Sequence, residues 1–559
     1  MHPVIPIKAA AGMILTAEPT PRVLLARRSA ALRFMAGFHV FPGGRIDDEE
    51  PTAPVVNALD TASARGVHAV AREIFEETGL LVGTRNANRL PAPSAKPETR
   101  FPGPDTTNAE SETIQRETIR AARMAILDGK DTFDAFLTRH HLRIDATQFE
   151  FAGDWVTPAI APIRFDTRYY IVRVPIATGE ELHVGEIDAL DWFTPAGARA
   201  AWRCGTIQLP PPVAYVLQNL AAYPFPDVLD HLRDCGEHTG DRPSKMEFAN
   251  GIYMLPLRSP TLPPATHTNC IIIGERELYL IDPAANDDEE RALLIRQIKL
   301  LEDLGGAVKA IILTHSHIDH VCAANFCRQH YNAPIWAHPE TARQLGIDFG
   351  ELGVENGVSG NAKQDPNTAF HRSPTANDSP TEMEFPKPDT RNPTPAPPVD
   401  RYLHDGDLIT IPGAPPWQLR ALHTPGHDPG HLCFIEETTR TLIAGDLIAN
   451  PGTIVVSLDH GGDMTQFIDS LERVANQPGY DTILPAHGMP LTHGPDKIRK
   501  HLEHRLWREG KVKAAIEAGK TALAEILPLA YDDVPPETWP LAELSLKSHL
   551  KRLNCLPSE

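Results

Sequence analysis

Three histidines and one aspartate stand within residues 315–320, in the order His315-Ser316-His317-Ile318-Asp319-His320. Neutral imidazole nitrogens and carboxylate oxygens are ligands that a borderline metal such as zinc prefers. Because His315 and His317 alternate along the chain, a loop can turn both toward one metal and leave Asp319 and His320 for a second. The alternative is a histidine-rich surface loop, but chelation is the commoner reason for such a cluster. The run therefore predicts a metal site.

Three glutamates stand at helical spacing in a second segment, Arg72-Glu73-Ile74-Phe75-Glu76-Glu77-Thr78-Gly79. On a helix, Glu73, Glu76 and Glu77 share one face, at i, i+3 and i+4. Neighbouring carboxylates repel one another, so a divalent cation is a natural reason to place them together, and Gly79 suits the C-terminal cap of the helix. A solvated acidic helix face is the alternative interpretation.

The elements that position these residues are short apolar runs typical of buried strands. Residues 310–313 lead into the histidine cluster, and residues 270–273 and 278–281 flank a turn and predict a hairpin. Further candidate ligands stand where later strands are expected to end, each beside a Gly or Pro that a tight turn requires: His427, Asp446 and His487. After residue 488 the pattern becomes helical.

The whole chain bounds the class of protein. Its 559 residues should hold two or three domains, and 42% hydrophobic and 23% charged residues are ordinary for a globular protein. No apolar run reaches membrane-spanning length, and residues 9–17 are expected to form a first strand rather than a signal peptide. Seven cysteines without a C-x-x-C pair favour a reducing cytoplasm, and the net charge of −20 disfavours broad nonspecific binding to nucleic acid.

Polar segments that are poor in aliphatic residues divide the chain. Loop insertions are expected at about 51–66 and 89–112, and a linker at 224–249. Residues 355–400 cannot bury enough surface to offset the entropy of ordering, so they are expected to be a disordered insertion. The expected domains are residues 1–223, 250–495 and 496–559.

Taken together, the H-x-H-x-D-H run, T-P-G-H around His427, A-G-D at Asp446 and A-H-G at His487 resemble the metallo-β-lactamase superfamily over Asn250 to His487. The resemblance implies an α/β fold, an αββα sandwich with two Zn²⁺ ions at one edge. It implies one metal on His315, His317 and His427, and a second on Asp319, His320 and His487, with Asp446 as the bridge. It also implies that a hydroxide shared by the metals is the nucleophile and that the catalytic proton shuttle is Asp319 or a bound water. Asp282 is expected to be structural, and His431 fits the T-P-G-H-x-x-G-H pattern.

The segment after His487 resembles the β-lactamase-like protein 2 branch, whose members end in a small helical, winged-helix-like region. That branch includes a single-strand-specific endoribonuclease. Residues 497–513 carry seven basic side chains on an expected helix, which could bind RNA; a solvated helix face is the default interpretation.

The glutamate segment resembles the second half of the Nudix box, R-E-U-x-E-E-x-G-U, and Gly44 to Glu50 resembles its first half, although twenty-one residues rather than seven separate the halves. The interrupted box resembles that of Nudix enzymes that cleave coenzyme A, over about Val4 to Leu220. The resemblance implies an α/β/α sandwich with Mg²⁺ or Mn²⁺ on Glu73, Glu76 and Glu77. It assigns catalysis to Glu73 and to Arg72, which would orient the glutamates. Three arginines are candidates for phosphate contacts: Arg27, Arg28 and Arg33. The alternative is an exposed strand edge that carries arginines.

These features predict a bifunctional cytoplasmic metallohydrolase. Its Nudix domain would cleave a nucleoside diphosphate derivative such as coenzyme A or acyl-coenzyme A, and its zinc domain a thioester, ester or phosphodiester. The first alternative is an RNA-processing zinc hydrolase. In a further one, the Nudix domain is an inactive nucleotide-sensing module. The sequence gives no oligomeric state.

Overall fold

The computed structural model describes residues 6–18, 22–32, 34–47, 49–52, 54–86, 116–158, 161, 163–175, 186–233, 244–351 and 398–556. It divides into two compact units, Met1–Asn250 with Pro490–His493, and Gly251–Met489 with Gly494–Glu559. Arg33, the expected loop 89–112 and nearly all of the expected insertion 355–400 lie outside the described residues. Among the described helices, none is long and apolar enough to cross a membrane.

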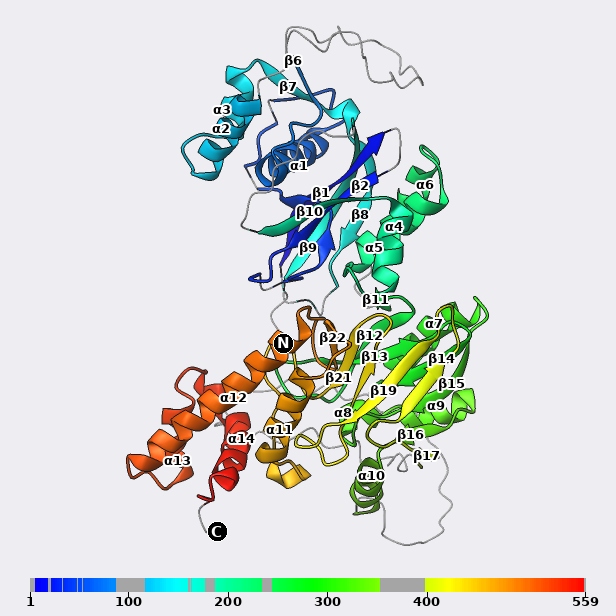
Figure 1. Ribbon diagram of the computed structural model, residues 1–559, viewed down its shortest axis with the longest axis vertical. Helices are drawn as coiled ribbons and strands as arrows, with labels where there is room; N and C mark the ends of the chain where they lie inside the picture. The colour runs from blue at the N-terminus through cyan, green and yellow to red at the C-terminus, as the bar shows by residue number, and fades with distance from the viewer. Residues whose placement is uncertain are drawn as a thin grey trace, which may run out of the picture. The chain divides into compact units, whose positions relative to one another are not determined.

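The first unit is built on a mixed sheet in the order β10-β2-β1-β9-β8, with β3 beside β2 and β4 beside β1. Helix α1 covers one face of this sheet, and α4, α5 and α6 cover the other (Figure 1). The expected first strand at 9–17 is confirmed as β1. The elements are β1 (Ile7–Glu18), β2 (Arg22–Arg28), β3 (His39–Val40), β4 (Gly43–Arg45), β5 (Val55–Val56), α1 (Thr61–Thr78), β6 (Thr84–Asn86), α2 (Arg116–Leu127), α3 (Phe133–Arg139), β7 (Leu142–Asp145), β8 (Glu150–Val156), β9 (Arg164–Pro175), β10 (Ile187–Phe193), α4 (Pro195–Arg203), α5 (Pro211–Ala222), α6 (Val228–Arg233) and β11 (Met246–Ala249).

Helix α1 carries the three glutamates, and its ends follow from local chemistry. The Asp60 carboxylate accepts a hydrogen bond from the Ser63 amide at 2.7 Å, which caps the N-terminus. Gly79 adopts a left-handed φ of 74° and closes the C-terminus, as expected. The sequence predicted a loop over 51–66, but residues 61–66 belong to α1, because the cap at Asp60 starts the helix at Thr61.

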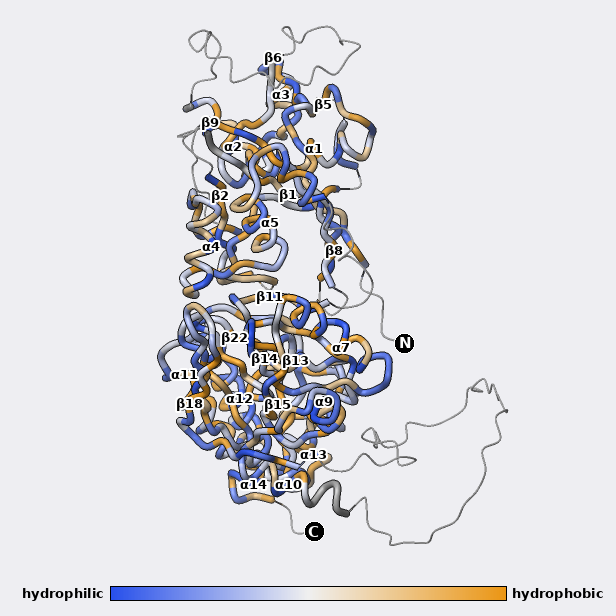
Figure 2. The backbone as a smooth tube through the Cα atoms, turned by 90° about the vertical axis from the view of Figure 1, so that its right-hand side faces the viewer, coloured by the Kyte–Doolittle hydropathy of each residue, from blue (hydrophilic) through white to orange (hydrophobic). Residues whose placement is uncertain are grey.

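The second unit contains two sheets, β12-β13-β14-β15-β16-β17 and β18-β19-β20-β21-β22. The sheets pack face to face, since Ile271 and Ile281 of the first line one small cavity with Ile443 and Leu484 of the second. Helices α7 and α9 lie outside the first sheet and α11 outside the second, which gives the expected αββα sandwich (Figure 1). Hydrophobic residues run along the central strands in Figure 2.

The expected hairpin is confirmed as β13 and β14. The elements of the sandwich are β12 (Ile252–Arg258), β13 (His267–Ile273), β14 (Glu277–Ile281), α7 (Asp288–Glu302), β15 (Ala307–Ile312), α8 (Ile318–Val321), α9 (Ala324–Tyr331), β16 (Ile335–Ala337), α10 (Pro339–Glu351), β17 (Arg401–Tyr402), β18 (Leu408–Ile411), β19 (Trp417–His423), β20 (Leu432–Glu436), β21 (Thr441–Gly445), α11 (Met464–Ala475) and β22 (Thr482–Pro485).

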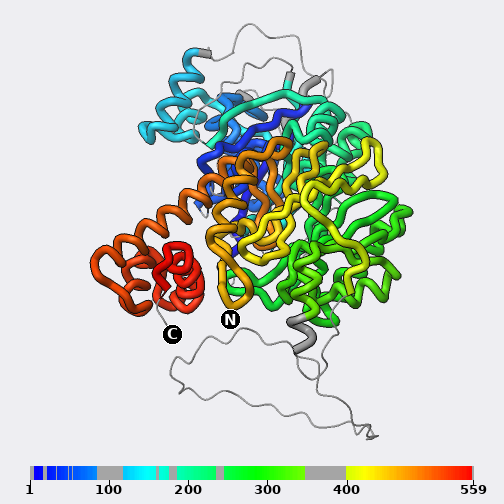
Figure 3. The backbone as a smooth tube through the Cα atoms, turned by 60° about the horizontal axis from the view of Figure 1, so that its bottom comes forward, coloured from blue at the N-terminus to red at the C-terminus, as the bar shows by residue number. Residues whose placement is uncertain are grey.

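Three helices complete the second unit: α12 (Gly494–Glu517), α13 (Leu523–Ala530) and α14 (Trp539–Arg552). They enclose a small apolar core that includes Val512, Ile526, Leu546 and Leu550. Figure 3 shows the long helix α12 leading into α13 and α14 near the end of the chain. We call α12, α13 and α14 together the C-terminal helical region.

Candidate functional site

The candidate ligands of the second unit all stand just after strands. His315, His317, Asp319 and His320 follow β15, Asp446 follows β21 directly, and His487 comes two residues after β22. His427 lies in the loop between β19 and β20. The loops converge, so side chains up to 172 residues apart, such as His315 and His487, meet at one site.

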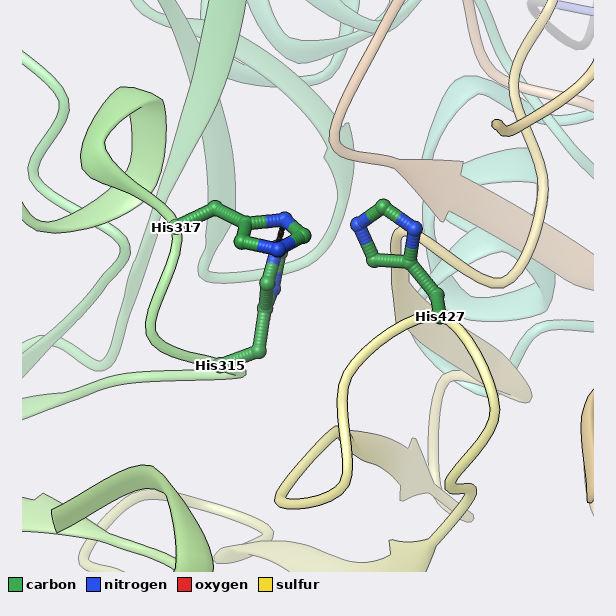
Figure 4. Close-up of side chains that lie close together, drawn as sticks. All are labelled: His315, His317 and His427. Carbon is green, nitrogen blue, oxygen red and sulfur yellow. Dashed lines mark hydrogen bonds between the residues drawn. The ribbon is translucent and has the colours of Figure 1, made fainter. Parts of the chain in front are cut away.

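Two separate trios of ligand atoms form there. His315, His317 and His427 each offer one atom within 4.8 Å of the others, and so do Asp319, His320 and His487. Figure 4 shows the first trio, with His315 and His317 from one loop turned toward His427 from another. His315 Nε2 lies 3.1 Å from His317 Nδ1. These are the two sets expected from the sequence.

The Asp446 carboxylate lies between the two trios. Its Oδ2 is 3.3 Å from His427 Nε2 of the first trio, and its Oδ1 is 3.3 Å from His487 Nε2 and 3.5 Å from His320 Nε2 of the second. One carboxylate can therefore bridge two metals, one through each oxygen.

Hydrogen bonds away from the centre orient the imidazoles. His427 Nδ1 donates to the Val455 carbonyl at 2.8 Å, and His487 Nδ1 donates to the His267 carbonyl at 3.0 Å. A carbonyl can only accept, so Nδ1 carries the proton in both rings and the lone pair of Nε2 faces the centre.

Asp282 holds the histidine loop. It accepts hydrogen bonds from the Thr314 amide at 2.8 Å, from the Thr314 hydroxyl at 2.6 Å and from His320 Nδ1 at 2.8 Å. Because the Thr314 hydroxyl donates to Asp282, its oxygen accepts from His315 Nδ1, 3.0 Å away. Asp282 thus has the structural part expected of it, although its carboxylate also lies within ligand distance of His315 and His320.

The electrostatics of the site suit a cation. Burial, together with the other imidazoles, lowers the pKa of His315 and His317 well below the ordinary value, so both rings are neutral. Burial opposes protonation of His320, but Asp446 and Asp319 raise its pKa well above the ordinary value. Several buried atoms have no hydrogen-bond partner, which is costly in the absence of a ligand: His317 Nε2, His320 Nε2, His427 Nε2 and Asp446 Oδ1. The residues present therefore fit a dinuclear metal site.

Other residues at the site were missed by the sequence analysis or given no definite part. His431 Nε2 accepts from the Asp446 amide at 2.9 Å, so His431 positions the bridging residue. Asp428 accepts from the Ser316 hydroxyl at 2.5 Å and the Gly430 amide at 2.6 Å, which ties the two loops of the first trio together. His460 lies at the site with its ring centre 5.8 Å from that of His317. Asp428 and His460 stand outside the superfamily's ligand motifs, so the sequence offered no signal for them.

The glutamate cluster of the first unit is a second candidate site. Arg72 Nη1 donates to Glu73 at 2.9 Å and lies 3.6 Å from Glu76, and the Gly43 amide donates to Glu77 at 3.1 Å. Burial, with repulsion between the carboxylates, raises the pKa of Glu73 to about 7 and that of Glu77 to about 8. A divalent cation would relieve this repulsion. In the described part of the chain, these three glutamates do not bring one ligand atom each to within 4.8 Å of one another, as each trio of the second unit does.

The interrupted sequence box closes in space. Arg72 Nε donates to Glu50 at 3.1 Å, so the two halves meet in spite of the twenty-one residues between them. Buried His68 lies beyond Glu50, with Nδ1 2.7 Å from Glu50 and Nε2 2.8 Å from Asp134. We call Glu50, His68 and Asp134 the support chain of Arg72. Glu50 ends the first half of the box, whereas His68 and Asp134 lie outside both halves and had no signal in the sequence.

Of the arginines expected to contact phosphate, Arg27 and Arg28 are described, and they point in different directions. Arg28 interacts electrostatically with Glu77 and Glu186, so it lies beside the glutamate cluster. Arg27 is adjacent to it on β2 and pairs with His39 of β3. Since neighbouring strand residues point to opposite faces, only Arg28 belongs on the face of the glutamates.

The basic helix does not offer the expected RNA surface at two positions. Arg505 is 5% exposed and donates to the Ile454 carbonyl, and Arg508 is 3% exposed and donates to the Ala530 carbonyl and to Asp533. These guanidinium groups stabilise the fold instead. RNA binding by other residues of 497–513 stays a prediction.

Comparisons with known proteins agree with the sandwich. Residues 263–487 match the family model of the metallo-beta-lactamase superfamily, and residues 522–554 match the beta-lactamase associated winged helix domain. The lactamase-like protein aptB of Emericella nidulans is 34% identical over 24% of this chain and 43% of its own length. The hydroxyacylglutathione hydrolase GloC of Haemophilus influenzae is 27% identical over 42% of this chain and 91% of its own.

An atrochrysone carboxyl ACP thioesterase of Aspergillus chevalieri is 30% identical over 24% of this chain and 43% of its own length, so the chain spans less than half of these fungal relatives. Among solved structures, a metallo-beta-lactamase family protein from Thermus thermophilus has a TM-score of 0.39 at 23% identity, over 55% of this chain and 93% of its own. A NUDIX hydrolase from Alicyclobacillus acidocaldarius has a TM-score of 0.33 at 24% identity, over 41% and 98%. Two of these relatives are named as a hydrolase and a thioesterase, and the matched domain is that of a metallohydrolase.

Proposed function

We propose that the metallo-beta-lactamase superfamily domain of this chain hydrolyses a thioester at a dinuclear zinc centre. The observation that carries the proposal is the Asp446 carboxylate, which has one oxygen beside His427 and the other beside His320 and His487. Thioesters are favoured over other esters because GloC and the fungal ACP thioesterase are relatives of this domain.

The chain's own residues would divide the work. Two Zn²⁺ ions, when bound, would lower the pKa of a water molecule and offset the negative charge that develops on the carbonyl oxygen. The six trio residues and Asp446 hold the metals, and the Val455, His267 and Asp282 acceptors keep three of the rings in the right tautomer. Asp319, whose side chain is 14% exposed, lies at the edge of the centre and would take up the proton of the attacking water.

We further propose that the first unit is a Nudix diphosphatase that uses Mg²⁺ or Mn²⁺. The support comes from the spatial closure of Glu50 on Arg72 and from the glutamate face beside Arg28. Glu73, Glu76 and Glu77 would hold the cation, Arg72 would orient them, and Arg28 would contact a phosphate.

A single substrate class would serve both sites. Acyl-coenzyme A has a thioester for the zinc centre and a diphosphate for the glutamate cluster, and it is a cytoplasmic metabolite. The six described cysteines are free, which suits the same compartment.

The test is a pair of double variants assayed on acyl-coenzyme A. His315→Ala with Asp446→Ala should abolish release of the free thiol, measured with a thiol-reactive dye. Glu76→Gln with Glu77→Gln should abolish Mg²⁺-dependent cleavage of the diphosphate, measured by chromatography of the nucleotide product. Thiol release by the first variant at the wild-type rate would refute the zinc assignment, and diphosphatase activity that survives the second would refute the glutamate assignment.

A further inference from the structure

The segment 454–456 lies between a candidate metal ligand and the C-terminal helical region. The Val455 carbonyl accepts the hydrogen bond from His427 Nδ1 at 2.8 Å. His427 is only 8% exposed, and its Nε2 is buried without a hydrogen-bond partner. The direction of the Val455 carbonyl therefore helps to decide where that lone pair points.

Both peptide neighbours of Val455 are held by residues of helices that come 51 to 92 positions later in the chain. Arg505 of α12 donates to the Ile454 carbonyl. On α14, the Ser545 hydroxyl accepts from the Val456 amide at 3.3 Å, and the Ser548 hydroxyl donates to the Val456 carbonyl at 2.7 Å. The three holding side chains are buried, with exposed fractions of 5% for Arg505, 5% for Ser545 and 1% for Ser548.

This arrangement restricts rotation of the segment. A peptide plane turns only if its own amide and carbonyl give up their partners, and a buried polar group left without a partner is costly inside a protein. Bonds on either side of Val455 thus fix its carbonyl. Arg505 also lies 5.2 Å from the ring of Phe467 on α11, so the guanidinium is itself held in place.

We infer that the C-terminal helical region is a working part of the metal centre, with Arg505, Ser545 and Ser548 as positioning residues for His427. The inference rests on the proposed zinc function and deepens it. The region holds the Val455 carbonyl, the carbonyl holds the His427 tautomer, and His427 completes the first trio.

The experiment uses the full chain with Ser548→Ala. Loss of its hydroxyl should weaken binding of the zinc ion at the first trio about tenfold, as is typical for residues that orient ligands. Competition with a chromophoric chelator measures that affinity. The absorption bands of the Co²⁺-substituted protein should also change, because they report the ligand geometry. Thr538→Ala is the matched control, since it removes an exposed hydroxyl just before α14 that donates to the Pro535 carbonyl.

A second variant keeps the test decisive if Ser548→Ala does not fold. Ser545→Ala removes the bond to the Val456 amide and should weaken zinc binding in the same direction. Unchanged zinc affinity and an unchanged Co²⁺ spectrum in a folded variant would overturn the inference while leaving the proposed function intact. Wild-type protein that binds no zinc would instead refute the proposed function.

Discussion

At the scale of single residues, Asp446 determines what the second unit can do. Its carboxylate reaches both trios, with Oδ2 beside His427 on one side and Oδ1 beside His487 on the other. His431 fixes its backbone through the bond to the Asp446 amide. A carboxylate held this way can keep two cations at a short, fixed separation, as a shared nucleophile requires.

Asp446→Asn should therefore reduce bound zinc from two ions to one and lower kcat for thioester hydrolysis by roughly 100-fold or more. An amide presents only one oxygen and no negative charge, so it cannot bridge two cations equally well. Metal analysis after dialysis and steady-state assays measure both effects. Asp459→Asn, an exposed substitution in the segment that carries His460, is the control and should leave both values unchanged.

The residue scale also shows what a sequence can predict. His315, His317, Asp319 and His320 were predictable because their spacing is local and their chemistry is specific. Asp428 and the Val455 carbonyl were not, because each acts through a contact with a loop remote in sequence. A backbone carbonyl leaves no trace in residue type. The ligands could therefore be named from the sequence, whereas the groups that orient them needed the fold.

At the scale of elements, α1 depends on the support chain. Burial of Glu50 alone would raise its pKa, but hydrogen bonds from His68 and Arg72 outweigh burial and lower it to about 2. The ordinary value is 4.5, so this stabilisation is fully present above pH 4.5 and is lost as the pH falls toward 2. The pKa of His68 is raised, because hydrogen bonds to Asp134 and Glu50 outweigh burial. The contribution of His68 to stability is therefore fully present below its ordinary pKa of 6.5 and is lost as the pH rises through its pKa in the folded protein.

Acid denaturation tests this element. The first unit of the wild type should lose on the order of 1–3 kcal/mol of unfolding free energy between pH 5 and pH 3 through Glu50. Glu50→Gln should be less stable at pH 6 and should show a flatter pH dependence over that interval. Urea denaturation at each pH measures the difference. Glu117→Gln, on the exposed side of α2, should keep the wild-type slope. An equally steep slope in Glu50→Gln would contradict the assignment.

Helix α12 makes a second element-scale prediction. Arg508 is buried against Tyr531, with its Cζ 4.3 Å from the centre of the tyrosine ring, and it pairs with Asp533. Arg508→Glu should lower the free energy of unfolding by about 3 kcal/mol or more, because the new carboxylate is buried and lies opposite the Asp533 carboxylate. The variant should therefore unfold at lower urea and lose zinc activity with it. Lys500→Glu, exposed on the same helix, should change stability by less than about 0.5 kcal/mol. If Arg508→Glu keeps its stability and loses only RNA affinity, the RNA hypothesis is favoured.

At the scale of the whole molecule, the proposed function joins two kinds of hydrolysis with different metal requirements. Imidazole-rich ligands suit Zn²⁺, and an all-carboxylate face suits Mg²⁺ or Mn²⁺. The fold class of each unit was predictable because strand periodicity and motif order extend over long stretches of sequence. The closure of Glu50 on Arg72 was not predictable, since it depends on how residues 51–71 return to the sheet.

Product analysis of acyl-coenzyme A is the sharpest test at this scale. Wild-type protein with both metals should convert it with two waters into the carboxylic acid, 4′-phosphopantetheine and adenosine 3′,5′-bisphosphate. The His315→Ala, Asp446→Ala variant should cut only the P–O–P bond and leave acyl-phosphopantetheine with its thioester intact. The Glu76→Gln, Glu77→Gln variant should release the acid and stop at intact coenzyme A. Mass spectrometry separates the three patterns. Because each variant removes ligands at only one of the two sites, a change in both products from either variant would show that the sites are coupled or that one of the assignments is wrong.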